Sequence, residues 1–460
     1  MRAYLVSSIA VTCAAALALP LSLATPAASH QPAALAARPD AEVAGSTQSL
    51  PLQPLEDGRR AIRAPGATGA VQGLTRRDVR PFSLLGVVWD DARAHLHGTV
   101  QVRTRATGTG GWSAWQELEV HNDEHGADPG TAEAVSGAVR GSTAPLWVGD
   151  SDGVEIRVLP EGGSGTGRGL IPSGLRLELV DPGQEQDPAQ QQEQGRDRFD
   201  ALDGKAPAAY GGTVSHGSQG VRAAQRGPSV EEAAAFSVNA QLAPVGTAVI
   251  PAAAAAKPYI GPRPKIITRK GWGANEKLRE KGFVYTKSVK TAFVHHSATG
   301  NNYTCKQAPS VLRSIYRYHT QSSGWRDFGY NFAVDKCGNI YEGRAGGVSK
   351  PVLGAHTLGF NTNSMGIAVL GTYSSTNPPA AVTTAIARLT AWKLGLHGGN
   401  PKGKATLTSG GGNRYKKGTK VKFNTIAGHR DGYATACPGA RLYGKLGTTR
   451  TASAKYQGRP

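Results

Sequence analysis

The sequence predicts an α/β domain, in which helices flank a mixed central β-sheet, preceded by a small all-β sandwich and low-complexity linkers. Three observations support this fold class. Apolar and polar residues alternate in short runs between residues 79 and 181, which is the period of half-buried strands. Between residues 261 and 446, strand-like apolar runs alternate with helix-like periodicity. The stretches on either side of the sandwich are low in complexity and show no periodicity.

Residues 1–29 have the three parts of a secretory signal peptide. Arg2 gives a positive start, an apolar run follows from Leu5 to Leu23, and small residues at 27–29 offer a cleavage site. The short apolar core and Pro20 favour a signal peptide over a membrane anchor. We therefore expect a secreted, extracellular protein with no membrane span after signal cleavage.

The region between the signal peptide and residue 260 is expected to hold one folded unit between two unfolded stretches. Residues 30–78 are predicted to be disordered, residues 79–181 to form the sandwich, and residues 182–260 to be a flexible linker. Trp112, Trp115 and Trp147 could stack on sugar rings, although core packing is the commoner role of such residues. The sandwich is thus a binding module or a spacer.

Residues 261–446 are expected to form the α/β domain, and residues 447–460 a frayed basic tail. The domain's helices are expected at 309–320 and, opening with Asn377 and Pro378, as far as Leu396. Its strands are expected at 291–296, 329–334, 340–344, 365–370 and 422–426. The turn at Gly338 makes the second and third of these strands a hairpin.

The net charge limits the classes of partner, and the cysteine count limits the number of disulfides. The net charge of +19 would suggest nucleic acid for an intracellular chain, whereas a secreted chain is better matched to anionic wall polymers or acidic surfaces. Of four cysteines, Cys13 lies in the signal peptide. The remaining odd number predicts one disulfide and one thiol with another task.

Two histidines and one cysteine in separate segments suggest a metal site. His295 ends a predicted strand, His429 lies in a Gly-His-Arg-Asp motif, and Cys437 follows it by eight positions. Two imidazoles and a thiolate would leave a tetrahedral zinc with one open position, as in catalytic rather than structural sites.

Six motifs, in order, resemble the peptidoglycan recognition protein family, which includes the T7 lysozyme type of N-acetylmuramoyl-L-alanine amidase. The resemblance covers roughly residues 265–445, and the preceding sandwich and linker look like those of secreted actinobacterial amidases. The motifs are Phe293-Val294-His295-His296-Ser297-Ala298, Gly329-Tyr330-Asn331-Phe332, Ile340-Tyr341-Glu342-Gly343-Arg344, Gly354-Ala355-His356-Thr357-Leu358-Gly359, Gly366-Ile367-Ala368-Val369-Leu370-Gly371 and Gly428-His429-Arg430-Asp431.

The resemblance implies a role for each matching residue. His295, His429 and Cys437 match the zinc ligands, and Tyr330 and Thr435 match catalytic positions that would stabilise the oxyanion. The remaining matches are substrate contacts, namely His356, Asn331 and Arg344. Cys305 and Cys337 are then expected to form the disulfide, since Cys437 is assigned to the metal.

The function implied is that of a secreted, wall-associated zinc amidase that cuts between the lactyl group of muramic acid and L-alanine in peptidoglycan. Tyr330 is the first choice for the group that passes a proton to the leaving amine, and Glu342 is the second. The alternative is a non-catalytic peptidoglycan-binding protein, although such members typically lack the cysteine ligand. A structural zinc domain and a nucleic-acid binder are further rivals, and the signal peptide argues against the latter.

Overall fold

The computed structural model describes residues 45–55, 71–120, 124–161, 171–183 and 259–460. The predicted signal peptide and nearly all of the predicted 182–260 linker therefore lie outside the described residues. All described residues belong to one compact unit, Val43–Pro460. Within them, no helix is both long and apolar enough to cross a membrane.

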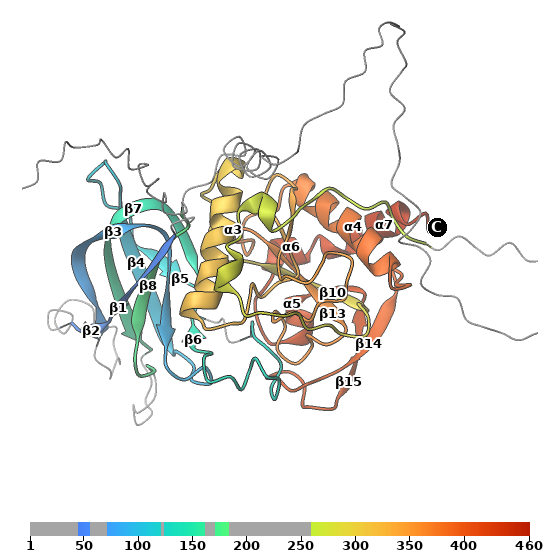
Figure 1. Cartoon of the computed structure of the whole chain (residues 1–460), viewed down its shortest axis with the longest axis horizontal. Helices are drawn as coiled ribbons and strands as arrows, with labels where there is room; N and C mark the ends of the chain where they lie inside the picture. The colour runs from blue at the N-terminus through green and yellow to red at the C-terminus, as the bar shows by residue number, and fades with distance from the viewer. Residues whose placement is uncertain (1–44, 56–70, 121–123, 162–170, 184–258) are drawn as a thin grey trace, which may run out of the picture. The chain divides into compact units, whose positions relative to one another are not determined.

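The N-terminal described region is an all-β domain whose strands are hydrogen-bonded into one antiparallel sheet (Figure 1). Its strands are β1 (Ser46–Pro51), β2 (Gln53–Pro54), β3 (Gln72–Trp89), β4 (Gly98–Ala106), β5 (Gln116–Leu118), β6 (Gly141–Ser142), β7 (Leu146–Pro160) and β8 (Arg176–Asp181). The main path runs β1-β8-β3-β7-β4-β5, and β2 and β6 also pair with β3. Register shifts along β3 let this long strand bend around a core of alternating apolar side chains.

The β domain bears on two predictions, the disorder of residues 30–78 and the role of the three tryptophans. The prediction of disorder for residues 30–78 is wrong where β1, β2 and the start of β3 lie. Trp147 is buried, as a core residue would be. Trp112 and Trp115 are only partly buried, and arginine guanidinium groups lie over their rings.

The C-terminal domain has the predicted mixed sheet, in the order β16-β10-β13-β11-β12-β9. All neighbours are parallel except the β11–β12 hairpin. The strands are β9 (Ile266–Ile267), β10 (Thr291–His296), β11 (Phe332–Val334), β12 (Ile340–Glu342), β13 (Ser364–Val369) and β16 (Ile426–Gly428), and a separate hairpin joins β14 (Lys404–Thr408) to β15 (Lys420–Asn424).

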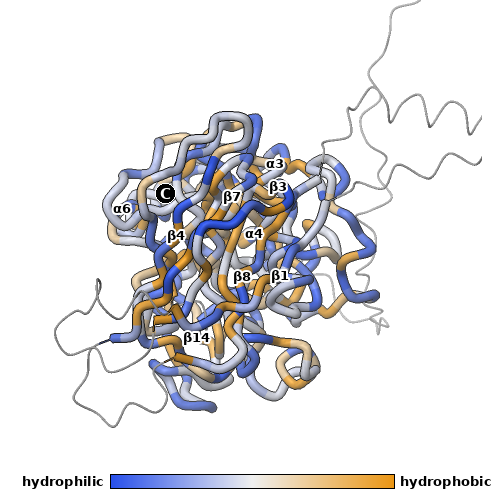
Figure 2. Tube along the Cα trace, turned by 90° about the vertical axis from the view of Figure 1, so that its left-hand side faces the viewer, coloured by the Kyte–Doolittle hydropathy of each residue, from blue (hydrophilic) through white to orange (hydrophobic). Residues whose placement is uncertain are grey.

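Helices cover both faces of this sheet, so its central strands are buried on both sides. They are α3 (Ala308–Arg317), which continues as the π-helical turn Tyr318–Ser322, α4 (Ala380–Gly395), α5 (His429–Gly432), α6 (Ala440–Tyr443) and α7 (Leu446–Tyr456). In β13, Ile367 packs in the core with α4, and the next residue, Ala368, packs in the core with α3. Figure 2 shows apolar and polar stretches interleaved along the strands, helices and loops.

The predicted frayed tail is instead a helix. Leu446, Ser453 and Ala454 of α7 are buried. The helix packs on α4, where the Ser453 and Thr390 hydroxyls lie 2.9 Å apart. The prediction of an unstructured 447–460 segment is therefore wrong, whereas the predicted disulfide is present, with the Cys305 and Cys337 Cα atoms 6.2 Å apart.

The β domain packs directly against α3 and the turn that follows it. Leu84, Trp147 and Val180 of the β domain share a core with the apolar face of α3. Tyr318 is fully buried at this contact, and its hydroxyl lies within hydrogen-bond distance of two carbonyl oxygens, 3.3 Å from that of Val87 and 3.1 Å from that of Thr143. The contact fixes the β domain relative to the sheet that carries the candidate site.

Candidate metal centre

Parallel strand pairing brings the first two candidate ligands together. Val294 of β10 is in register with Gly428 of β16. The next residues, His295 and His429, therefore lie side by side at the carboxyl ends of these two neighbouring strands. Their ring centroids lie 4.4 Å apart, and both side chains are fully buried. Carboxyl ends of adjacent parallel strands are where α/β sheets commonly place reactive groups.

The loop between α5 and α6 supplies a buried cysteine to the same cluster. The Cys437 sulfur lies 3.8 Å from Nδ1 of His295, and Cys437 is not in a disulfide. The backbone N–H of Cys437 donates to the Thr435 hydroxyl at 3.1 Å. The structure thus brings together all three residues that the sequence predicts as ligands, with Thr435 hydrogen-bonded beside them.

A fourth side chain, His125, completes this cluster. It comes from the segment between β5 and β6 of the β domain, and its ring centroid lies 4.6 Å from that of His429 and 5.3 Å from that of His295. One ligand atom from each of His125, His295, His429 and Cys437 lies within 4.8 Å of the other three. The sequence predicts a zinc site with one open position, whereas the structure brings a third imidazole into the cluster.

Burial sets the protonation states of this cluster. It lowers the pKa of His295 and His429 well below the usual range, and that of His125 to about 3, because a charged imidazole loses hydration there. The three rings are therefore neutral at neutral pH. Burial also raises the pKa of the Cys437 thiol, so metal binding would displace a proton from the sulfur.

The donor set fits a zinc ion. Neutral imidazoles and a thiolate are the ligands that zinc prefers, and zinc bonds of about 2.0–2.3 Å place ligand atoms of a tetrahedral site roughly 3.3–3.7 Å apart. Small side-chain rotations would close the observed cluster to that spacing. Both ring nitrogens of His125 are buried without a hydrogen-bond partner among the described residues, as expected for a side chain that binds an ion.

Two further side chains pack around the cluster. The Tyr330 ring lies 5.2 Å from that of His295 and 5.7 Å from that of His125, and burial raises its pKa, so the phenol stays protonated. The His356 ring lies 5.4 Å from that of His295, and His356 is fully buried. The Thr357 hydroxyl lies between the two histidines, 3.0 Å from Nδ1 of His356 and 3.4 Å from Nε2 of His295, and can orient the latter ring.

The two remaining predicted substrate contacts, Asn331 and Arg344, and the second candidate for proton transfer, Glu342, have hydrogen-bond partners outside the cluster. The Asn331 amide bridges the backbone, accepting from the Gly366 N–H at 2.9 Å and donating to the Val352 carbonyl at 2.8 Å. The Glu342 carboxylate accepts from the backbone N–H of Arg269. Arg344 is buried in an ion pair with Glu133 of the β5–β6 segment.

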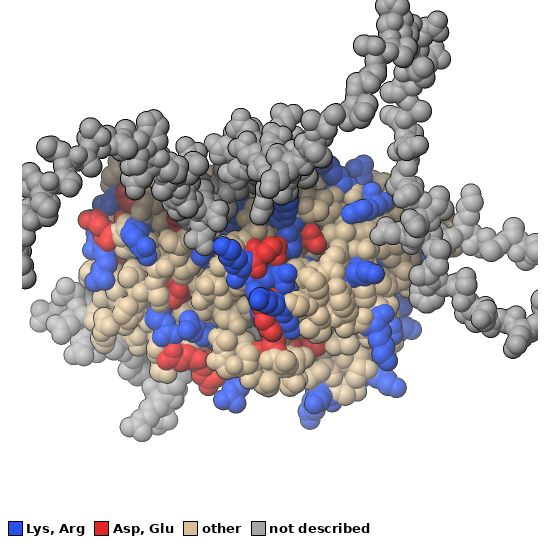
Figure 3. Space-filling model, viewed as in Figure 1, with Lys and Arg blue, Asp and Glu red and all other residues tan. Residues whose placement is uncertain are grey.

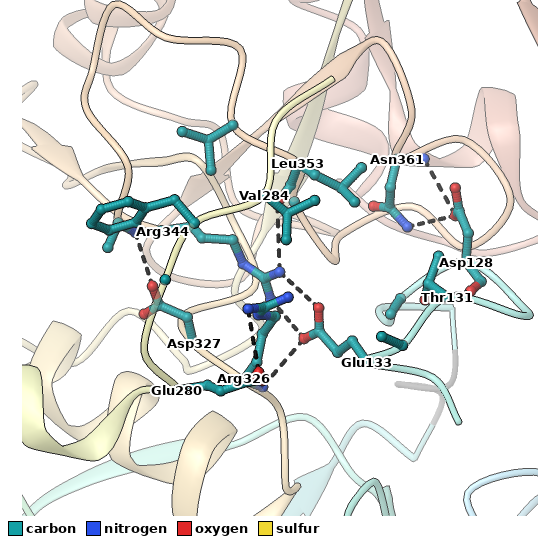
Figure 4. Close-up of a pocket in the computed structure, with 17 residues that line it drawn as sticks. Asp128, Thr131, Glu133, Glu280, Val284, Arg326, Asp327, Arg344, Leu353 and Asn361 are labelled. Atoms are coloured by element: carbon teal, nitrogen blue, oxygen red, sulfur yellow. Dashed lines mark hydrogen bonds and ion pairs between the residues drawn. The ribbon is translucent and has the colours of Figure 1, made fainter. Parts of the chain in front are cut away.

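A cavity of about 280 Å³ lies beside that ion pair (Figure 4). Its walls come from both domains: Asp128, Thr131 and Glu133 on one side, and residues of the α/β domain on the other. Figure 4 shows the Arg344 guanidinium pointing at the Glu133 carboxylate, and the Asn361 side chain pointing at Asp128.

On the face of the molecule seen in Figure 3, basic and acidic side chains are interspersed.

Sequence reasoning missed the residues that the β domain contributes. His125 is one of 12 histidines and lies far from the motifs that carry the resemblance. The available signal was local: His125 lies in a polar stretch with Glu124 and Asp128, between two strands, with no strand periodicity of its own. Such a stretch in a small sandwich indicates a long loop, and long loops often carry functional residues.

Comparisons with known proteins agree with this division of the chain. A family model described as N-acetylmuramoyl-L-alanine amidase matches residues 285–440. A second, described as Rv3811 N-terminal galactose-binding domain-like, matches residues 30–195.

Individual relatives match about two fifths of the chain. Peptidoglycan-recognition protein SC2 of Drosophila melanogaster is 30% identical over 185 residues, which is 40% of this chain and 85% of that protein. Human N-acetylmuramoyl-L-alanine amidase is 29% identical over 201 residues, 43% of this chain and 30% of that protein. The solved structure of Drosophila PGRP-LB has 25% identity, covers 40% of this chain and 93% of that one, and gives a TM-score of 0.32.

Proposed function

Because the chain belongs to the family of peptidoglycan-recognition proteins and N-acetylmuramoyl-L-alanine amidases, we propose that it is a secreted zinc amidase acting on peptidoglycan. The bond cut is the amide between the lactyl group of muramic acid and L-alanine. One observation carries the proposal: His295, His429 and the free thiol of Cys437 converge beside Tyr330. A recognition protein that only binds has no need of this thiol.

The chain's own residues supply what amide hydrolysis requires. Bound zinc would provide a Lewis acid and a nucleophile at neutral pH. The Tyr330 phenol, kept protonated by burial, can donate a hydrogen bond to the developing oxyanion. Thr435 can present its hydroxyl to the same region, since it lies two residues before Cys437 and hydrogen-bonds to the Cys437 backbone.

Secretion is part of the proposal and rests on the first 29 residues and the disulfide. Disulfides persist in oxidising compartments outside the cytosol, and Cys305–Cys337 ties the start of α3 to the β11–β12 turn. An extracellular location would bring the site to its wall substrate. The net charge of +19 would favour approach to anionic wall polymers.

The test is release of free N-terminal L-alanine from purified peptidoglycan by residues 30–460, before and after chelation and zinc replacement. We expect release that a chelator abolishes and zinc restores, and none from Cys437→Ser. Equal release by Cys437→Ser would refute the zinc assignment. Wall binding without release, by the wild type and by His125→Ala alike, would show a recognition protein instead.

A further inference from the structure

The segment between β5 and β6, residues 124–140, lies across the candidate site; we call it the strap. We propose that His125 of the strap is a fourth protein ligand of the zinc, and that the strap thereby keeps the amidase latent until it is displaced. The inference rests on the proposed function, since it assumes zinc at His295, His429 and Cys437.

The first argument is the number of ligands. A catalytic zinc keeps one position open for water or substrate, whereas a closed site has four protein ligands. His125 brings the cluster to three imidazoles and one thiolate, all buried. With His125 bound, the position that the reaction needs is filled by a side chain of the β domain.

The second argument is that the strap also occupies the groups expected to act on substrate. The Thr435 hydroxyl donates to the Glu124 carboxylate at 2.6 Å. Arg344 makes two bonds to the Glu133 carboxylate, at 2.8 and 2.9 Å. Neither Thr435 nor Arg344 can serve a substrate in the same way while the strap is in place.

The third argument is that the strap is held along its length rather than at one point. The Leu358 N–H donates to the Glu124 carbonyl at 3.0 Å, and the Asn361 amide donates to Asp128 at 2.6 Å. At the far end, the Arg140 N–H donates to the Ser323 carbonyl at 3.0 Å. The strap is therefore hydrogen-bonded to the α/β domain at both ends and in the middle, as expected for a segment that is held in place over the site.

The fourth argument is close backbone contact at a glycine. Gly324 has φ +72°, and a Cβ at this position would lie 1.8 Å from the Ala138 carbonyl oxygen of the strap. Any larger residue would push the strap away. The α/β domain is therefore shaped to receive the strap as well as to hold the metal.

The experiment compares zinc-loaded residues 30–460 with the variant His125→Ala. X-ray absorption at the zinc edge counts imidazole and sulfur ligands, and L-alanine release from peptidoglycan measures turnover. The matched control is His97→Ala, which removes an exposed histidine from the same domain. If His125→Ala fails to fold by circular dichroism, His125→Phe keeps a ring of similar size without a ligand atom.

We expect three imidazoles and one sulfur in the wild type and the control, and two imidazoles and one sulfur in the variant. Turnover should rise about tenfold or more in the variant, because activity scales with the fraction of molecules in the competent state. Two imidazoles in the wild type, or turnover no higher in the variant than in the control, would overturn the inference alone. Loss of the sulfur ligand from every protein would overturn the proposed zinc site, and the inference with it.

Discussion

The ion pair between Glu133 and Arg344 allows a quantitative test of how firmly the strap is held. Only 7% of the Glu133 side chain and 5% of the Arg344 side chain are exposed. Glu133→Gln keeps the shape and one acceptor, but leaves the Arg344 charge without a counter-ion from the strap. Breaking a buried pair from one side costs roughly 3–5 kcal/mol. Because glutamine can still accept one hydrogen bond, we expect a loss near the lower figure.

That loss should appear as easier local opening of the strap. Hydrogen exchange measures such opening at the amides of Thr131 and Val135, which donate within the strap to Asp128 and Thr131. A loss of about 3 kcal/mol speeds exchange by roughly 10²-fold, since each 1.4 kcal/mol is a factor of ten.

Glu155→Gln is the control, because it makes the same substitution in a more exposed pair. Glu155 lies 2.5 Å from Arg103, with 20% and 23% of the two side chains exposed. Pairs at the surface contribute roughly 0.2–1 kcal/mol to stability. Because this pair also lies outside the strap, hydrogen exchange in the strap should stay unchanged. Equal strap exchange in the two variants would refute the reasoning that the buried pair holds the strap.

Three further predictions follow from single side chains. Tyr330→Phe should lower amidase turnover by about 10²–10³-fold through loss of an oxyanion donor, without changing the zinc content measured by atomic absorption; an unchanged rate would exclude that role. Burial lowers the pKa of Lys393 to about 7, so the unfolded state binds more protons between that pH and about 10.5. In urea titrations the wild type should therefore gain up to about 1.4 kcal/mol per pH unit relative to Lys393→Met across this window, and parallel profiles would contradict the shift. A Cβ on Gly86 would lie 2.3 Å from the Tyr318 hydroxyl oxygen. Gly86→Ala should thus lower unfolding stability by about 1–3 kcal/mol, and a loss of the same size in a Tyr318→Leu background would show that the clash is elsewhere.

The strands and helices of the C-terminal domain were predictable because each carries a local signal. Residues 291–296 form β10 as expected, and the predicted hairpin is β11–β12. The α7 helix carries no such signal: it packs through small and polar residues such as Thr449, Ser453 and Ala454, which leave no apolar periodicity. β1 was missed for a related reason, since it is an edge strand whose sequence, Ser-Thr-Gln-Ser-Leu-Pro, is mostly polar.

The candidate site was predictable only in part. His295, His429 and Cys437 lie within motifs, and the structure brings them together. His125 joins them through the packing of one domain on another, and neither spacing nor periodicity encodes such a contact. The buried partners of Arg344 and Thr435 were missed for the same reason, because they too come from the strap.

The order of the strap and the metal ligands along the chain has a consequence for biosynthesis. Residues 124–140 leave the ribosome before His295, and Cys437 is made after both. The segment that covers the site therefore already exists when the sheet that builds the site is completed. Under the proposed function, the metal site would therefore form with its strap already present, and the enzyme would be made in its latent state.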